Sequence, residues 1–532
     1  MNENAAYFIT LALILAVRVF HQGSASRILG IFPMPSISHQ VVFRGLTTAL
    51  RDRGHELIVI TPDPINDPTL KNYTEIDISF LYADFTKDMD WIATRDKGTW
   101  FEVFRSIAPR FTPMSERVLN HPDVKKLYSP NSGEKFDLLI IEMLYWHTFL
   151  SLAKYLDVPV IGVTSLSMPL QMQYGIGNPV MPSHPAHWDA EIKVLGKLSL
   201  CQRLWNFVYA WRFLHYYRTV YLRGHQEISR KYFGSELPDI ADIEKNISLV
   251  FVNQQAPILF VRPNLPKMID IGGFQRSKKI EPLSKNLQKT LDDATQGFIY
   301  MSLGTNVKSV MLSNETRKEF LATFSQLPYT VIWKFENENL PGRPDNVIIM
   351  KWAPQQSILA HPNIKAFIYQ GGLQSTEEAI SHVVPVIGLP VFADQDTQVN
   401  KMVSLGVGKK LEIVNINRMD LVDAIDSVVR DDSYKQRMLK LRDLMRDKPH
   451  DSLENAVWWT EHVIRHKGAP HLHSSIADDP WYQRQDMDLI FIISIAIWTA
   501  LIITLVVLYK LLRHSIHVLK YQLLVSKEKK VC

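Results

Sequence analysis

The amino-acid sequence predicts an α/β protein with two doubly wound domains, followed by one membrane-spanning helix. Three observations support this prediction: a strand–loop–helix–strand pattern opens near residue 27, a similar pattern starts again near residue 298, and residues 489–509 form an uninterrupted apolar run. Parallel strands need a long crossover connection, which is usually a helix, so each pattern indicates a parallel sheet. A length of 532 residues also favours two domains over one.

The first domain is expected over residues 27–280, and its pattern is clearest at the start. An apolar strand leads into a loop rich in Pro and Ser, a helical stretch follows from about Gln40 to Arg53, and Gly54 ends that helix. The chain then returns to an apolar segment, which completes a βαβ unit. Strands are predicted at Arg27–Phe32, Leu57–Thr61, Leu138–Ile141 and Val158–Val163.

The second domain is expected over residues 281–455, because a charged segment without an apolar run, residues 275–290, separates the two halves. In doubly wound domains ligands bind outside the carboxyl ends of the strands, so a cleft between the two sheets is predicted. No G-x-G-x-x-G follows either opening strand, which gives a nicotinamide or flavin enzyme little support. Strands are predicted at Phe298–Ser302, Thr330–Lys334, Val347–Met350, Ala366–Tyr369 and Val386–Leu389, and helices at Asn314–Gln326, Ser375–His382 and Leu421–Arg430.

Both ends of the chain have the composition of membrane-targeting segments. Residues 1–26 are predicted to be a signal peptide, with a retained anchor or a buried helix as the alternatives. Residues 489–509 contain no charged side chain, and 21 residues at about 1.5 Å each span a hydrocarbon core of about 30 Å. Residues 456–488 are expected to be a helix and a juxtamembrane segment, and residues 510–532 a tail.

The charge distribution predicts a single-pass type I protein of the endoplasmic reticulum membrane. The tail holds six Lys or Arg and one Glu, which accounts for the formal net charge of +5, so it should face the cytosol and leave the body in the lumen. Lys529 and Lys530 resemble a dilysine retrieval signal, although lysines there also suit anionic lipid head groups. Sequons acceptable for glycosylation of a lumenal body lie at Asn72, Asn246 and Asn314.

The remaining composition excludes several classes of function. Outside the tail the chain is formally neutral, so it lacks the excess of positive charge that is typical of a nucleic-acid-binding protein. Its two cysteines, Cys201 and Cys532, would lie on opposite sides of the membrane, so neither a disulfide between them nor a cysteine metal site is expected.

Residues 351–402 carry the most specific pattern, KWAPQQSILAHPNIKAFIYQGGLQSTEEAISHVVPVIGLPVFADQDTQVNKM. This segment closely resembles the signature of UDP-dependent glycosyltransferases, and the segments RILGIFPMPSISHQ and WWTEHVIRHKGAPHL extend the resemblance over nearly the whole chain. The chain resembles the insect-type, membrane-anchored members most. The resemblance implies a GT-B fold, in which two facing Rossmann-like domains bind the acceptor (N-terminal) and the UDP-sugar (C-terminal).

The residues of this segment suit a nucleotide diphosphate. Gly371 and Gly372 permit close backbone approach, and the helix expected to start near Ser375 offers free N–H groups and the positive end of its dipole. Without the surrounding pattern, a Gly pair before a helix would usually be only a turn. Trp352 would then be read as an aromatic residue of the core, and Glu378 as part of a solvated helix face. The resemblance implies contacts of Trp352 and Gln355 with uracil, of Glu378 with ribose, of Asp394 and Gln395 with the sugar hydroxyls, and of Ser302, Thr305, Gln370, Gly371, Gly372 and Ser375 with the phosphates.

His39 is the candidate general base, since it lies where the first strand turns into the first helix and where the family places its base. A lone histidine in a loop is more often a surface residue. The family's orienting carboxylate follows an apolar strand, and FDLLIIE puts Glu142 at that place. Two residues depart from the family pattern: Glu142 stands for the usual Asp, and Gln370 stands for a histidine at the diphosphate.

Together with the resemblance, these residues predict an inverting transfer of a hexose from a UDP-sugar to a hydroxyl of a small lipophilic acceptor. The resemblance to insect-type members implies glucose as the preferred sugar, with glucuronate second. The UDP-sugar is a co-substrate, and neither a further cofactor nor a metal is expected. The alternatives are a UDP-sugar-binding protein with lost turnover, suggested by Gln370 and Glu142, and a receptor or structural membrane protein without a nucleotide site. A homo-oligomer is left open. Eight aromatics in residues 204–222 indicate helix packing or, alternatively, an acceptor pocket or a membrane contact.

Overall fold

The computed structural model describes residues 25–86, 89–95, 98–184, 187–193, 196–273 and 280–528. The chain forms two compact units, one ending at His473 and the other beginning at Ser474. The predicted signal peptide up to residue 24, and Lys529 and Lys530, lie outside the described residues.

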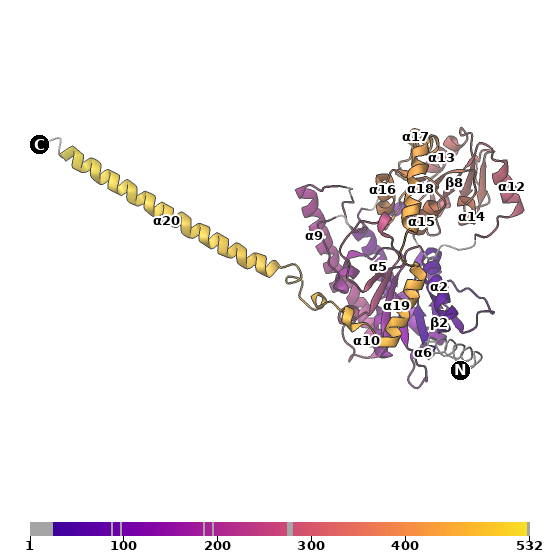
Figure 1. Ribbon diagram of the computed structural model, residues 1–532, viewed down its shortest axis with the longest axis horizontal. Coiled ribbons are helices and arrows are strands. Elements are labelled where there is room, and N and C mark those ends of the chain that lie inside the picture. Colours follow the sequence, from indigo (N-terminus) through magenta and orange to yellow (C-terminus); the bar gives the residue numbers. More distant parts are fainter. Residues whose placement is uncertain are drawn as a thin grey trace, which may run out of the picture. The chain divides into compact units, whose positions relative to one another are not determined.

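The first sheet has seven parallel strands in the order β3-β2-β1-β4-β5-β6-β7 (Figure 1). Strand β1 lies between β2 and β4, so the strand order reverses there, and a doubly wound sheet opens a crevice at such a switch point. Its strands are β1 (Arg27–Ile31), β2 (Glu56–Thr61), β3 (Tyr73–Asp77), β4 (Leu138–Glu142), β5 (Val160–Thr164), β6 (Leu249–Val252) and β7 (Met268–Asp270).

The second sheet has six parallel strands in the order β10-β9-β8-β11-β12-β13. Numbered from its own first strand this is 3-2-1-4-5-6, the order of a Rossmann sheet, with the switch point between β8 and β11. The prediction of two doubly wound domains is therefore confirmed. The strands are β8 (Phe298–Ser302), β9 (Thr330–Lys334), β10 (Val347–Met350), β11 (Ile364–Tyr369), β12 (Val386–Gly388) and β13 (Gly408–Lys410).

Helices cover both faces of each sheet because successive strand side chains point to opposite sides. On β1, Ile28 faces a core that includes α2 and α19, whereas Leu29 faces the core formed with α5. The main helices are α2 (Ile37–Asp52), α3 (Leu81–Thr86), α4 (Trp91–Thr94), α5 (Trp100–Asn120), α6 (Pro122–Tyr128), α7 (Thr148–Tyr155), α8 (Leu170–Gly175), α9 (Leu200–Tyr216), α10 (Leu222–Phe233), α11 (Ile240–Lys245), α12 (Lys285–Asp293), α13 (Asn314–Phe324), α14 (Gln355–Leu359), α15 (Leu373–Ser381), α16 (Gln395–Ser404), α17 (Arg418–Arg430), α18 (Asp432–Arg446) and α19 (Ser452–His466).

After the second sheet the chain returns to the first domain. Helix α19 buries Ala456, Val457 and Val463 in the same core as α2, and Glu461 accepts hydrogen bonds from Arg53 at 3.2 and 3.3 Å. The C-terminal helix of the body therefore belongs by packing to the N-terminal domain.

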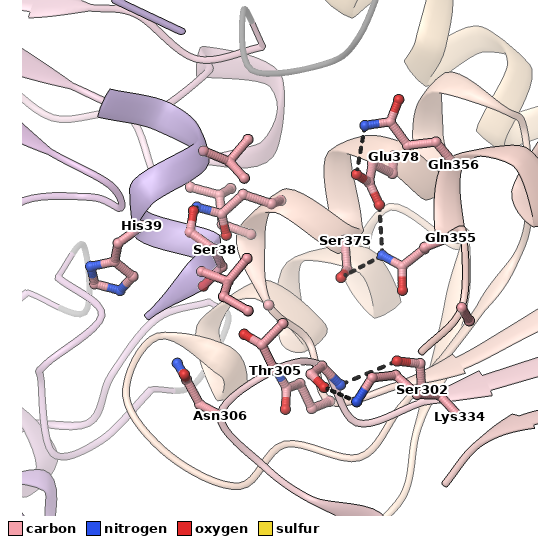
Figure 2. Close-up of a pocket in the computed structure, with 18 of the residues that line it drawn as sticks. Ser38, His39, Ser302, Thr305, Asn306, Lys334, Gln355, Gln356, Ser375 and Glu378 are labelled. Atoms are coloured by element: carbon pink, nitrogen blue, oxygen red, sulfur yellow. Dashed lines mark hydrogen bonds between the residues drawn. The ribbon is translucent and has the colours of Figure 1, made fainter. Parts of the chain in front are cut away.

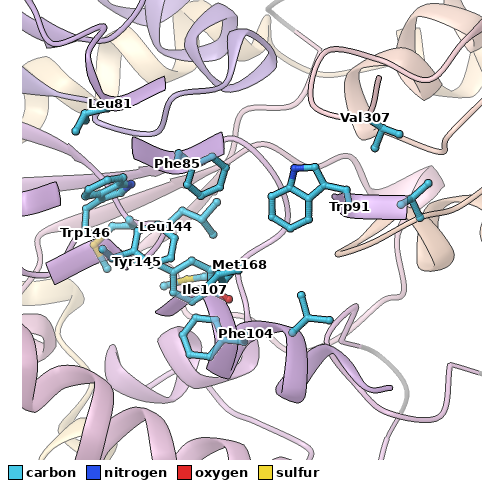
Figure 3. Close-up of a cluster of buried hydrophobic side chains, with 14 of the residues drawn as sticks. Leu81, Phe85, Trp91, Phe104, Ile107, Leu144, Tyr145, Trp146, Met168 and Val307 are labelled. Atoms are coloured by element: carbon cyan, nitrogen blue, oxygen red, sulfur yellow. The ribbon is translucent and has the colours of Figure 1, made fainter. Parts of the chain in front are cut away.

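One buried cluster continues from the first domain into the second. It contains large aromatics from α5 and from the segment after β4, such as Phe104, Tyr145 and Trp146, and it reaches Val307 of the second domain (Figure 3). Trp91 stacks on Phe392 with ring centroids 4.2 Å apart. The two domains thus share apolar core as well as a cleft.

The second unit contains α20 (Met487–Glu528), of which Met487–Leu524 is long and apolar enough to cross a membrane by length and composition. The helix does not end at Tyr509, where the predicted span stops, but continues to Glu528.

Several details differ from the sequence-based expectations. Helix α2 starts at Ile37 instead of Gln40, and α15 at Leu373 instead of Ser375; each follows directly on an extended N-cap residue, Ser36 or Gly372. Strands β3, β6, β7 and β13 were not predicted; β7 and β13 have only three residues each, too few to show a period. In the aromatic stretch, Tyr209, Phe213, Tyr217 and Tyr221 are buried in the core of the first domain. None of the residues 204–222 lines the cleft described below.

Candidate functional site

A cavity of about 540 Å³ lies where the switch points of the two sheets face each other. The first domain contributes Leu166 and residues from the start of α2, and the second contributes the loop after β8, the end of β9, and residues at and just before the starts of α14, α15 and α16 (Figure 2). All predicted catalytic and donor residues except Glu142 and Gly371 line this cavity. They are His39, Ser302, Thr305, Trp352, Gln355, Gln370, Gly372, Ser375, Glu378, Asp394 and Gln395.

On the N-terminal wall, His39 is the third residue of α2 and Glu142 is the last residue of β4, so both stand at the first switch point. The imidazole Nδ1 lies 3.1 Å from Glu142 Oε1, and the backbone N–H of Met34 donates to Oε2 at 2.9 Å. Burial raises the pKa of the Glu142 carboxyl, and the bonds from His39 and Met34 oppose that rise. Glutamate in place of the family's aspartate thus still reaches the imidazole.

On the opposite wall, four side chains form one hydrogen-bond network. The Gln355 amide donates to Ser375 Oγ at 2.9 Å and to Glu378 Oε2 at 2.6 Å, and Gln356 donates to Glu378 Oε1 at 3.0 Å (Figure 2). Beside this network Trp352 is 60% exposed, so its ring is accessible to a planar ligand. Ser375, expected at the phosphates, thus accepts a hydrogen bond from Gln355, the residue expected at the uracil.

The two glycines before α15 have different surroundings. Gly371 has φ +91°, and a Cβ there would lie 2.5 Å from Val399 Cγ2 and 2.9 Å from Gln395 O. It is packed against α16 and is not among the residues that line the cavity, so its contact with the diphosphate stays a prediction. Gly372 lines the cavity and caps the amino end of α15, where free N–H groups are available.

Gln370 precedes this pair at the carboxyl end of β11, and its Oε1 is buried without a hydrogen-bond partner among the described residues. Its amide group lies against Gly304, whose φ of +84° and lack of a side chain leave room for it. Ser302 accepts a hydrogen bond from the Gly304 N–H at 3.3 Å, and Thr305 follows in the same loop.

Asp394 and Gln395 open α16. Burial raises the pKa of Asp394 to about 6, and its Oδ2 has no hydrogen-bond partner in the described part of the chain. Gln395 Oε1 instead accepts from the N–H groups of Val391 and Phe392 at 2.8 and 3.1 Å, which fixes the loop before the helix. Asp394 is therefore the member of the pair with an oxygen available to a ligand.

Direct contacts between the domains frame the cavity. Ser36 Oγ and the Asn306 side chain lie 3.0–3.1 Å apart, and the Gln374 amide donates to the carbonyls of Ser38 and Ser165 at 3.3 and 3.0 Å. Away from the cavity lining, Arg95 of the first domain pairs with Asp396 and with Glu412 of the second, the latter at 2.9 Å.

Sequence reasoning missed several lining residues, including Tyr300, Asn306, Lys334 and Gln374. Lys334 ends a strand that was predicted with the correct bounds, so its place at the carboxyl edge of the sheet could have been inferred. Asn306 and Gln374 touch the other domain, and a single sequence contains no signal for that.

The predicted glycosylation sites lie outside the cavity. Asn72, Asn246 and Asn314 are all exposed, with Asn72 in a turn at φ 57° and Asn314 at the start of α13. Exposure makes the three sites accessible, and their modification stays a prediction.

Comparisons with known proteins agree with the geometry of the cleft. Residues 28–520 match the family model described as UDP-glucoronosyl and UDP-glucosyl transferase. The chain is 33% identical over 505 residues to UDP-glycosyltransferase UGT5 of Dactylopius coccus, with 93% of each chain covered. It is 29% identical over 511 residues to the ecdysteroid UDP-glucosyltransferase of Spodoptera littoralis nuclear polyhedrosis virus, covering 92% of this chain and 97% of the relative.

Solved structures support the fold. A UDP-glucosyltransferase from Polygonum tinctorium, described as capable of glucosylating indoxyl, superposes with a TM-score of 0.53 at 16% identity and covers 83% of this chain and 99% of its own. Family match, relatives and architecture agree with the resemblance of residues 351–402. The chain therefore belongs to the UDP-glycosyltransferase family, GT-B enzymes that transfer a sugar from a UDP-sugar.

Proposed function

We propose that the protein transfers glucose from UDP-glucose, with inversion, to a hydroxyl group of a small lipophilic acceptor, with His39 as the general base. The observation that carries the proposal is the His39 imidazole: it lines the same cavity as the donor residues, and its Nδ1 is 3.1 Å from the buried Glu142 carboxyl. That bond leaves Nε2 as the ring nitrogen able to accept a proton from the acceptor.

In the proposed reaction, the His39 Nδ1–H donates to Glu142 and Nε2 removes the acceptor's hydroxyl proton. The acceptor oxygen forms a bond to the anomeric carbon while the bond from that carbon to the diphosphate oxygen breaks, and UDP leaves with the electron pair. The Glu142 carboxylate then stabilises the imidazolium, as the carboxylate of a catalytic triad does. A single displacement inverts the anomeric centre.

The donor residues are assigned along the cavity wall. Uracil stacks on Trp352 and forms a hydrogen bond with Gln355. The ribose hydroxyls donate hydrogen bonds to Glu378 and replace those that the amides of Gln355 and Gln356 donate to it in the ligand-free site. The diphosphate lies at Gly372, the start of α15, Gln370, Ser302 and Thr305, with Ser375 in a supporting position through Gln355. The sugar hydroxyls reach Asp394, with Gln395 holding the loop. No metal ion is needed in this scheme.

Two features favour a neutral hexose and an apolar acceptor. The buried Asp394 carboxyl beside the sugar subsite would repel the carboxylate of glucuronate. Around His39 the cavity is lined by Ile37, Val41 and Leu166. Relatives named glucosyltransferases favour glucose, while a 26% identical relative, UDP-glucuronosyltransferase 1-2 of Rattus norvegicus, keeps glucuronate as the second donor.

We further propose that α20 anchors the enzyme in the endoplasmic reticulum membrane with the body in the lumen. The length and composition of Met487–Leu524 and the basic residues after position 509 support this orientation. A lipophilic acceptor that partitions into the bilayer would then be concentrated near the enzyme.

The experiment that tests the proposed function supplies microsomes carrying the full chain with labelled UDP-glucose or UDP-glucuronate and a panel of phenols and steroid alcohols. We expect glucosides with the anomeric configuration inverted relative to the donor. Glucuronides as the main product would contradict the donor assignment, and a retained configuration would contradict the single displacement.

A further inference from the structure

The donor cavity has an unusual charge balance for a diphosphate site. Among its described lining residues, Glu281, Glu378 and Asp394 are acidic, while Lys334 alone is Lys or Arg. A diphosphate brings at least two negative charges, and more develop as UDP departs. Position 370, where the family has a histidine, holds a glutamine that cannot become charged. Among the described lining residues, Lys334 is therefore the one whose side chain can bring a fixed positive charge to the diphosphate.

Lys334 lies where such a cation is needed. It is the last residue of β9, so it stands at the carboxyl edge of the second sheet, and its Nζ donates to the Gly304 carbonyl at 3.0 Å (Figure 2). Gly304 in turn lies against the Gln370 amide. The same Nζ is 5.9 Å from the centroid of the Trp352 ring. The ammonium thus lies between the wall assigned to uracil and the wall assigned to the departing diphosphate.

The carboxylate partner of Lys334 lies outside the cavity. Glu336 Oε1 is 2.9 Å from Nζ, and its Oε2 accepts from the Val310 N–H at 3.2 Å; Glu336 does not line the cavity. The Lys334 and Glu336 side chains are 9% and 19% exposed. An ammonium has three N–H donors, of which the Gly304 carbonyl and Glu336 take two. The third is available for a phosphate oxygen, while the Glu336 carboxylate partly neutralises the charge of the ammonium.

We infer that the Lys334 ammonium binds the diphosphate of the donor and supplies the positive charge that Gln370 lacks. This inference rests on the proposed function and adds a residue to its donor site. Glu336 competes with the phosphate for the ammonium, so the pair sets the strength of the diphosphate contact. If Lys334 only held the loop after β8 against the end of β9, its loss would weaken the binding of UDP and of uridine equally.

Calorimetric binding of UDP and of uridine to the detergent-solubilised full chain separates these roles, because only UDP carries the diphosphate. Lys334→Met should weaken UDP binding about tenfold to a hundredfold, the usual effect of losing one charge-assisted hydrogen bond. Uridine binding should change less than about twofold. Lys334→Arg, which keeps the charge, should recover most of the UDP affinity.

Two further variants sharpen the test. Glu336→Gln should tighten UDP binding several-fold in the wild-type background and have no effect on UDP in the Lys334→Met background. Lys351→Met is the matched control, because Lys351 also pairs with a glutamate, Glu338 at 2.8 Å, but does not line the cavity. It should leave UDP affinity unchanged.

Equal losses for UDP and uridine in Lys334→Met, or unchanged UDP binding, would overturn the inference while the proposed function stands. Wild-type protein that binds UDP in a Lys334-dependent way but transfers no sugar would uphold the inference and contradict the proposed function. Wild-type protein that binds no UDP would overturn both.

Discussion

His39 Nδ1 and Glu142 Oε1 lie 3.1 Å apart, although 103 residues separate them in the chain. The two strands that flank the first switch point bring them together, since α2 follows β1 and Glu142 ends the neighbouring β4. Both are buried, at 7% and 1% exposure. The pair orients one ring nitrogen toward protein and the other toward the cavity, the geometry that a general base requires.

This pairing predicts that Glu142→Ala lowers kcat less than loss of the imidazole does. The ring would remain but would lose its orientation and the carboxylate that stabilises imidazolium. We expect a decrease of roughly tenfold to a hundredfold in kcat with little change in UDP affinity, measured by steady-state kinetics and calorimetry. An unchanged kcat would show that Glu142 does not act on His39 during turnover.

The Asp394 carboxyl predicts a pH dependence of sugar binding. Its folded pKa of about 6 lies above the ordinary value because of burial, and a sugar hydroxyl donates more strongly to the ionised form. Affinity for UDP-glucose relative to UDP should therefore be constant above about pH 7 and fall about fivefold as the pH drops through 6. Calorimetry without acceptor measures this ratio. If Asp394→Asn showed the same pH profile, the titration would belong to another group.

Gln370→His tests the effect of the departure from the family pattern. A histidine can donate a charge-assisted hydrogen bond to the leaving diphosphate, which is stronger than a neutral amide bond by about 1–2 kcal/mol. We expect kcat to rise by at most about thirtyfold, provided the imidazole ring fits against Gly304. Initial rates of UDP release measure the change. A large loss of activity with retained UDP binding would mean that this enzyme has adapted to glutamine.

The proposed topology predicts that protease added to intact microsomes removes only the C-terminal tail. Digestion of the body without detergent would contradict a lumenal active site. Replacing Lys529 and Lys530 by Ser should let the protein leave the endoplasmic reticulum, as followed by its glycan processing. Unchanged retention would count against the dilysine signal.

Much of the fold was predictable because each domain opens with an apolar strand, β1 or β8, and because Gly54 marks the end of the first helix. Strands β8, β9 and β10 were predicted with the bounds that the structure has. The placement of His39 and Glu142 followed from the family pattern and from the rule that strand ends converge.

What the sequence could not provide depends on contacts between distant segments. Gly371 was expected at the phosphates, and its φ of +91° and the close approach of Val399 add a packing role that no local pattern signals. Lys334 looked like the end of an ordinary strand, and only the meeting of β9 with the β8 loop places its ammonium beside Gly304. Arg95 joins Asp396 and Glu412 across more than 300 residues, and no local pattern signals such a pair.

The most direct test of the proposed mechanism is UDP release from UDP-glucose by wild-type and His39→Ala protein with a reactive hydroxyl acceptor. We predict acceptor-dependent release by the wild type and a roughly 10²–10⁴-fold lower kcat in His39→Ala, with UDP affinity unchanged. Near-normal turnover by His39→Ala would place the base elsewhere, and a wild type that binds UDP but releases none from UDP-glucose with any acceptor would contradict the proposed activity.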